Sequence, residues 1–115
     1  DLANAGHPSG VIYQEHSFEW LHSLTMPLGF IRDMDFETRT IDYDGRTRIV
    51  LSTDGLFDCF QFSPTKSLDQ AKGFLGQYMN LDNAAFVNQV KKEIACVEVE
   101  SKIDDISMVS ITIEP

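Results

Sequence analysis

Three aspartates stand where predicted strands begin or end, and such positions often hold catalytic and metal-binding side chains on a rigid frame. Asp54 follows shortly after the aliphatic run Ile49-Val50-Leu51, which is typical of a strand buried on both faces. Asp104 and Asp105 come just before the strand-like segment 106–113. If these strands are antiparallel neighbours, the end of one lies beside the start of the other, and the three carboxylates gather at one rim.

Carboxylates gathered in this way repel one another unless a cation or a proton lies between them. Hard oxygen ligands with no nearby histidine or cysteine favour Mg²⁺ or Mn²⁺ over Zn²⁺. Asp54, Asp104 and Asp105 are therefore the candidate metal ligands. The alternative for the paired acids is an ordinary solvated loop.

A hairpin turn is the alternative for Asp54-Gly55, because Asp-Gly is the strongest short hairpin signal. The chain contains a second such pair for comparison. Asp44-Gly45 lies between two strand-like segments, 36–43 and 49–51, as a hairpin turn should. Asp54-Gly55 is instead followed by Leu-Phe-Asp-Cys-Phe, which does not alternate and indicates a short helix or an irregular turn. We therefore predict the hairpin at Asp44-Gly45.

The remaining elements predict one α+β domain spanning residues 1–115. Further strands are expected at residues 10–13 and 18–24, paired with each other. A Ser67 cap with Gln70 three residues later predicts one helix, and Asp82 caps a second. In the last strand, Val109, Ile111 and Ile113 alternate with polar residues, which predicts that this apolar row is the buried face.

Composition narrows the class of protein. The chain has 115 residues, of which 43% are hydrophobic, as expected for a globular domain. No apolar run approaches the ~20 residues of a membrane span, and the net charge of −9 argues against a nucleic-acid partner. Cys59 and Cys96 predict two reduced, partly buried thiols in a cytoplasmic protein. Because the chain begins at Asp1, we expect a piece of a longer protein.

Other catalytic arrangements find little support. Cys59 lacks the following arginine that a cysteine-dependent phosphatase uses to hold phosphate. Ser52 has no Gly-x-Ser-x-Gly context. The three histidines, at positions 7, 16 and 22, do not have metal-ligand spacing.

Four short motifs occur in order along nearly the whole chain: Asn4-Ala5-Gly6-His7-Pro8, Met26-Pro27-Leu28-Gly29, Ser52-Thr53-Asp54-Gly55-Leu56 and Asp104-Asp105-Ile106-Ser107. Together they resemble the C-terminal half of a PPM-type metal-dependent protein serine/threonine phosphatase of the bacterial SpoIIE-like branch. The resemblance implies a sandwich of two antiparallel sheets flanked by helices, with two Mn²⁺ or Mg²⁺ ions at the sheet rim. This chain would form about half of that sandwich.

By the same resemblance, Asp54 and Asp104 are metal ligands, and Asp105 stands where many relatives carry asparagine. Gly55 and His7 are candidates for the cleft, although for His7 a loop histidine hydrogen-bonded to backbone is the favoured interpretation. The family's other metal-binding aspartate, which has its own Gly-His-Gly segment, is absent from this chain.

Function follows from the resemblance as an expectation. The parent protein would be a cytoplasmic signalling phosphatase that hydrolyses phosphoserine or phosphothreonine through metal-activated water, and the resemblance suggests a phosphorylated anti-sigma-factor antagonist as an example of its substrate. This chain alone would be inactive. The alternative is a non-catalytic interaction domain that keeps the fold. A half-sandwich should also expose an apolar sheet face, so a homodimer is expected to be possible.

Overall fold

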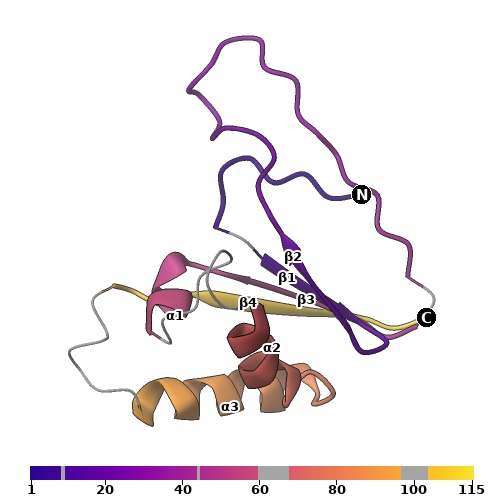
Figure 1. Cartoon of the computed structure of the whole chain (residues 1–115), viewed down its shortest axis with the longest axis vertical. Coiled ribbons are helices and arrows are strands. Elements are labelled where there is room, and N and C mark those ends of the chain that lie inside the picture. The colour runs from indigo at the N-terminus through magenta and orange to yellow at the C-terminus, as the bar shows by residue number, and fades with distance from the viewer. Residues whose placement is uncertain (9, 44, 60–67, 97–103) are drawn as a thin grey trace.

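A four-stranded antiparallel sheet with helices packed on one face forms the domain (Figure 1). The computed structural model describes residues 1–8, 10–43, 45–59, 68–96 and 104–115. The strands are β1 (Gly10–Gln14), β2 (Ser17–Leu21), β3 (Thr47–Ser52) and β4 (Met108–Ile113), in the spatial order β2-β1-β3-β4. The helices are α1 (Asp54–Cys59), α2 (Leu68–Gly76) and α3 (Asn83–Cys96). The α+β class is confirmed.

The sheet is built around β3, which pairs with β1 on one side and β4 on the other. β1 and β2 form the predicted hairpin, and their two-residue turn has positive φ at both Glu15 and His16. Positive φ at both central residues is the mark of a turn whose twist matches that of the strands. The expected strand 18–24 is real but ends earlier, at Leu21.

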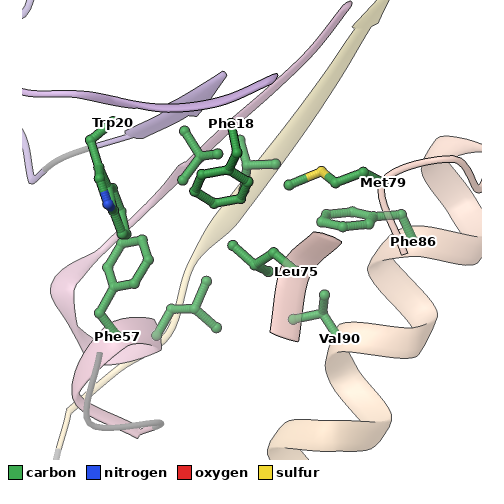
Figure 2. Packing of buried hydrophobic residues seen from close by; sticks show 10 residues of the cluster. Phe18, Trp20, Phe57, Leu75, Met79, Phe86 and Val90 are labelled. Atoms are coloured by element: carbon green, nitrogen blue, oxygen red, sulfur yellow. The ribbon is translucent and has the colours of Figure 1, made fainter. Parts of the chain in front are cut away.

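The hydrophobic core lies between the sheet and the helices (Figure 2). Trp20 of β2 packs edge-on against Phe57 of α1, with ring centroids 5.2 Å apart. Phe86 and Val90 of α3 are fully buried, as their helical spacing predicts. The buried cluster comprises Val11, Phe18, Trp20, Val50, Leu56, Phe57, Leu75, Met79, Phe86 and Val90.

Helix α3 begins as predicted, because the Asp82 carboxylate accepts a 2.8 Å hydrogen bond from the Ala85 N–H. The predicted Ser67 cap of α2 lies outside the described residues. α2 is short and ends at Gly76, in keeping with its two glycines. Among the described residues, no helix is both long and apolar enough to cross a membrane.

The prediction for the buried face of β4 is wrong. Ser110 and Thr112 face α3, where each hydroxyl bonds the Asn83 side chain at 2.9 Å. The apolar row points the other way, and Val109 and Ile111 are 56% and 42% exposed. The alternation is therefore present, but its apolar side faces the second surface of the sheet, which none of the three described helices covers.

The prediction of a strand at residues 36–43, turning through Asp44-Gly45 into β3, is also wrong. Both edges of β3 are already taken by β1 and β4, so no hydrogen-bonding edge remains for another strand. The segment makes one isolated bridge instead, between Arg39 and Leu2. Asp44 itself lies outside the described residues. Residues 22–43 form a long excursion above the sheet (Figure 1), and several large apolar side chains on it are exposed: Leu24, Met26, Leu28, Phe30, Ile31 and Phe36.

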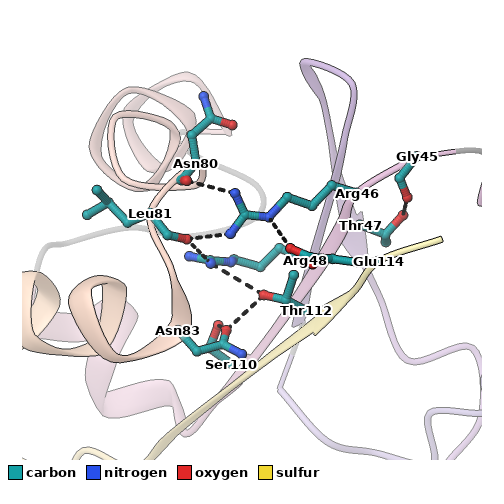
Figure 3. Close-up of polar contacts among 10 residues, drawn as sticks. All are labelled: Gly45, Arg46, Thr47, Arg48, Asn80, Leu81, Asn83, Ser110, Thr112 and Glu114. Carbon is teal, nitrogen blue, oxygen red and sulfur yellow. Dashed lines mark hydrogen bonds and ion pairs between the residues drawn. The ribbon is translucent and has the colours of Figure 1, made fainter.

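Two arginines of the β3 segment tie the connection between α2 and α3 to the sheet (Figure 3). Arg46 donates to the carbonyls of Asn80 and Leu81 at 2.8 and 2.7 Å and forms a 3.4 Å ion pair with Glu114. Arg48 also donates to the Leu81 carbonyl, and its guanidinium stacks over Phe86 at 4.5 Å from the ring centroid. These contacts fix the helical layer on the sheet.

Candidate functional site

All four sequence motifs emerge at the same end of the sheet. In the antiparallel ladder, Gly10 at the start of β1 lies opposite Leu21 at the end of β2. Ser52 at the end of β3 lies opposite Met108 at the start of β4. Because β1 and β3 are also antiparallel partners, these four positions share one end, which we call the motif rim. The first and fourth motifs lie just before β1 and β4, the third begins at Ser52, and the second begins at Met26, five residues after the end of β2.

At the motif rim, the first motif is hydrogen-bonded to the segment that leads from β2 to the second motif, and it packs against Pro27 of the second motif. The Asn4 side chain accepts from the His7 N–H at 2.9 Å and donates to the Leu21 carbonyl at 3.3 Å. The Ser23 hydroxyl accepts from the Gly6 N–H at 2.7 Å. Gly6 has φ +85°, and a side chain there would collide with the ring of Pro27. A glycine is therefore required where these two loops cross.

The last two motifs are bonded to each other through Thr53. Its N–H donates to the Ser107 carbonyl, and its hydroxyl donates to the Asp105 carbonyl and accepts from the Ser107 N–H, each at 3.0 Å. Gly55 lies directly against this segment. A Cβ on Gly55 would lie 2.6 Å from the Asp105 carbonyl oxygen and 3.3 Å from that of Asp104. The sequence thus brings the backbones of the Thr-Asp-Gly and Asp-Asp-Ile-Ser motifs into contact.

The three candidate ligands are exposed at this junction. Asp54 begins α1, as the absence of strand alternation after it predicts, and its Oδ1 accepts from the Gly55 N–H at 3.1 Å. The Asp104 Oδ1 accepts from the Asp105 N–H at 2.8 Å. Each of these bonds is local and leaves the second carboxylate oxygen available. No group of three or more histidine, cysteine or acidic side chains that could hold a metal occurs within the described parts of the chain.

His7 lies at the same rim but is occupied locally. Its Nδ1 donates to the Pro8 carbonyl at 2.7 Å, which is the backbone-bonded arrangement weighed from the sequence. Beside it is a pocket of about 230 Å³ that also involves Ala5, Leu21 and Leu51. The lining of this pocket is mostly apolar, and it includes residues of the first motif and Leu51 near the end of β3.

The arginines of the β3 segment are far from this rim. Arg48 precedes Ser52, the end of β3 at the motif rim, by four residues, which corresponds to roughly 13 Å of extended strand. Its pKa is lowered from the usual arginine value, first by burial and then by the nearby charge of Arg46, with Asp82 acting in the opposite direction. Both arginines serve the helical layer, so they do not contribute positive charge at the motif rim.

Two side chains weighed as protein nucleophiles, those of Cys59 and Ser52, are shielded from solvent. Cys59 is buried with 4% exposure, and Ser52 is buried with 3%. The expectation of a buried thiol is correct for Cys59 and wrong for Cys96, which is exposed near the end of α3. Cys96 lies at the end of α3, beyond the last residue of that helix whose side chain packs on the core, and its side chain is exposed to solvent.

The roles of Thr53 and Ser107 were not assigned from the sequence, although both belong to quoted motifs. The available signal was a hydroxyl residue placed between a buried strand and a glycine-flanked acid. Its meaning depends on partner residues 52 and 54 positions later, which only the β3–β4 pairing brings close.

Comparison with known proteins agrees with the motifs. Residues 1–114 match the family model "Stage II sporulation protein E (SpoIIE)". The chain is also 31% identical over 71 residues to phosphoserine phosphatase RsbP of Bacillus subtilis (strain 168). That alignment covers 57% of this chain and 18% of the relative, so the chain spans less than a fifth of that protein. No solved structure matches. Because the family model matches nearly the entire chain, the chain belongs to the SpoIIE family and is related to the PPM phosphatases.

Proposed function

We propose that the intact domain is a metal-dependent phosphatase that hydrolyses phosphoserine or phosphothreonine on a cytoplasmic signalling protein. The observation that carries the proposal is the junction at the motif rim, where Thr53 and Gly55 hold the Thr-Asp-Gly motif against the Asp-Asp-Ile-Ser motif. Membership of a phosphatase family supports the reaction class.

The donor chemistry of the junction fits a hard divalent cation. Asp54, Asp104 and Asp105 offer carboxylate oxygens and the adjoining backbone offers carbonyls, which suits Mn²⁺ or Mg²⁺. In our proposal Asp54 and Asp104 hold the metal, and Asp105 is the third candidate. The set is small, because the described residues contain no group of three acids or other ligands around one point. Binding to this chain alone should therefore be weak, with further ligands supplied by other parts of the intact protein.

Bound metal would lower the pKa of a water molecule and neutralise phosphate charge during hydrolysis. The part of this chain is to place the carboxylates. Gly55 allows the two acidic segments to approach, and Thr53 fixes their relative position. A covalent phosphoenzyme on Cys59 or Ser52 is not part of the proposed mechanism, because both side chains are buried. His7 lines a pocket with Leu51 at the same rim, but its Nδ1 donates to the Pro8 carbonyl, so we propose no catalytic role for it.

The substrate class rests on the relatives. RsbP is named a phosphoserine phosphatase, and resemblance to the SpoIIE-like branch suggests a phosphorylated anti-sigma-factor antagonist as the protein substrate. A second candidate function is a non-catalytic interaction domain with the same fold. The small ligand set among the described residues favours that alternative for this chain by itself.

Phosphopeptide hydrolysis tests the proposal. The intact protein and this chain are each assayed with Mn²⁺ and with a chelator. We expect turnover by the intact protein that the chelator abolishes, and little or none by the chain alone. Asp54→Asn should abolish turnover and keep the fold, whereas Asp58→Asn, an exposed acid one helical turn further along α1, should retain it.

Two outcomes would contradict the proposal. Hydrolysis that persists in chelator would exclude the metal-dependent mechanism. Vigorous turnover by this chain alone would refute the idea that further ligands are needed. An intact protein that is inactive with both metals and several phosphopeptides would favour the interaction domain.

A further inference from the structure

We propose that Thr53 is a positioning residue for the metal site, acting through its side-chain hydroxyl on the segment that carries Asp104. The inference rests on the proposed function, because it assumes that Asp54 and Asp104 act on the same metal. It assigns to Thr53 a role that neither the family match nor the identity to RsbP specifies.

The hydroxyl of Thr53 performs two tasks at once. It donates to the Asp105 carbonyl and accepts from the Ser107 N–H, each at 3.0 Å. Both partners are backbone groups on either side of Ile106, so the hydroxyl holds the ends of one short turn. A side chain without a hydroxyl could make neither bond, and the two backbone groups would then have to find water.

The position of Thr53 explains why these bonds matter. The regular β3–β4 ladder ends at Ser52 and Met108, one residue before the junction. Beyond that point, the Thr53 N–H bond to the Ser107 carbonyl extends the ladder by one step, and the hydroxyl extends it further to Asp105. Thr53 therefore fixes the position of residues 105–107, which lie just outside the sheet, relative to the paired strands β3 and β4.

Gly55 makes the same segment sensitive to small movements. The Thr53 hydroxyl donates to the Asp105 carbonyl, and the oxygen of this carbonyl is the closest atom of that segment to the position that a Cβ on Gly55 would take. Asp54 lies between these two contacts in the sequence. Loss of the hydroxyl should let the 104–107 segment move away from Asp54 while β3 and β4 remain paired. The expected defect is in metal affinity more than in folding.

A titration of this chain with Mn²⁺ alone tests the inference. Binding is measured by calorimetry or by the electron paramagnetic resonance signal of free Mn²⁺. Thr53→Val removes the hydroxyl at nearly constant shape, and Thr53→Ser keeps it. The matched control is Thr112→Val, since Thr112 bonds Asn83 and Arg48 at the other end of β4. We expect Thr53→Val to bind Mn²⁺ about tenfold more weakly, as loss of groups supporting metal ligands typically does. Thr53→Ser and Thr112→Val should bind like wild type.

The outcomes separate the two proposals. If wild type binds no Mn²⁺, the metal site fails and this inference fails with it. If wild type binds and Thr53→Val binds equally well, only the role of Thr53 is refuted. Weakening by Thr53→Ser or Thr112→Val as large as that by Thr53→Val would indicate a general structural effect and would also refute it.

Amide hydrogen exchange on the wild-type chain gives a second test that does not depend on variant folding. The Ser107 N–H should be protected, because it donates to the Thr53 hydroxyl, and its protection should increase when Mg²⁺ is added. Exchange of this amide at the rate of an unstructured peptide, with or without Mg²⁺, would overturn the inference.

Discussion

Gly55→Ala should destabilise the domain through one contact. A Cβ at this position would lie 2.6 Å from the Asp105 carbonyl oxygen, against at least 3.4 Å for an ordinary contact. The carbonyl would have to move by about 0.8 Å, and it is held in place by the 3.0 Å bond from Thr53. The contact involves backbone, so no side chain can rotate to relieve it.

The expected magnitude combines two opposing effects. Insertion of a methyl group into a well-packed site costs about 1–3 kcal/mol. Replacing glycine by alanine within a helix returns up to about 1 kcal/mol. The net loss of about 1–2 kcal/mol corresponds to a fall in melting temperature of roughly 4–8 °C for a domain of this size.

Thermal unfolding followed by circular dichroism measures the effect. The control is Gly73→Ala in α2, where a Cβ would meet nothing within 4 Å. That variant should melt at the wild-type temperature or a few degrees above it. If Gly55→Ala melts no lower than Gly73→Ala, the close approach of the two acidic segments is not present in the protein.

Three further predictions concern the frame that carries the site. Arg48→Ala should lower the free energy of unfolding by about 2–4 kcal/mol, measured with denaturant, because it opens a cavity beside Phe86. Arg48→Met keeps the packing and should lower it by about 1 kcal/mol or less. Equal losses for the two variants would contradict this prediction. Asp82→Ala should cost about 1 kcal/mol by removing the cap bond to Ala85, and Asp82→Asn only a few tenths, so a neutral alanine variant would refute the cap. The uncovered apolar row of β4 should make the chain associate as its concentration rises, and Ile111→Lys should suppress this in sedimentation velocity without loss of stability; a wild-type monomer at all concentrations would count against it.

The parts of the fold that could be predicted from sequence are those fixed by local physics. The aliphatic run at residues 49–51 correctly predicts the strand β3, but burial on both faces is wrong, because Val50 is buried under the helices while Ile49 and Leu51 on the other face are only half-buried. Asp82 specifies the start of α3 because its carboxylate satisfies a free N–H of the first turn. The lack of alternation after Asp54 correctly favours a helix over a hairpin.

The errors arise where a distant partner decides the outcome. Residues 36–43 have strand composition, but β1 and β4 already occupy both edges of β3. The alternation in β4 fixes which residues share a face, and only the position of α3 fixes which face is covered. The link from Thr53 to Ser107 joins residues 54 positions apart, so no local pattern reveals it.

A Mn²⁺ titration of this chain with single and double substitutions tests the central claim that Asp54 and Asp104 serve one metal site. Asp54→Asn and Asp104→Asn should each weaken binding by at least about tenfold. The double variant should be little worse than either single variant, because the site is already lost, and Asp58→Asn should bind like wild type. Two independent and additive losses, or losses no greater than that of Asp58→Asn, would mean that the two acids do not share a metal.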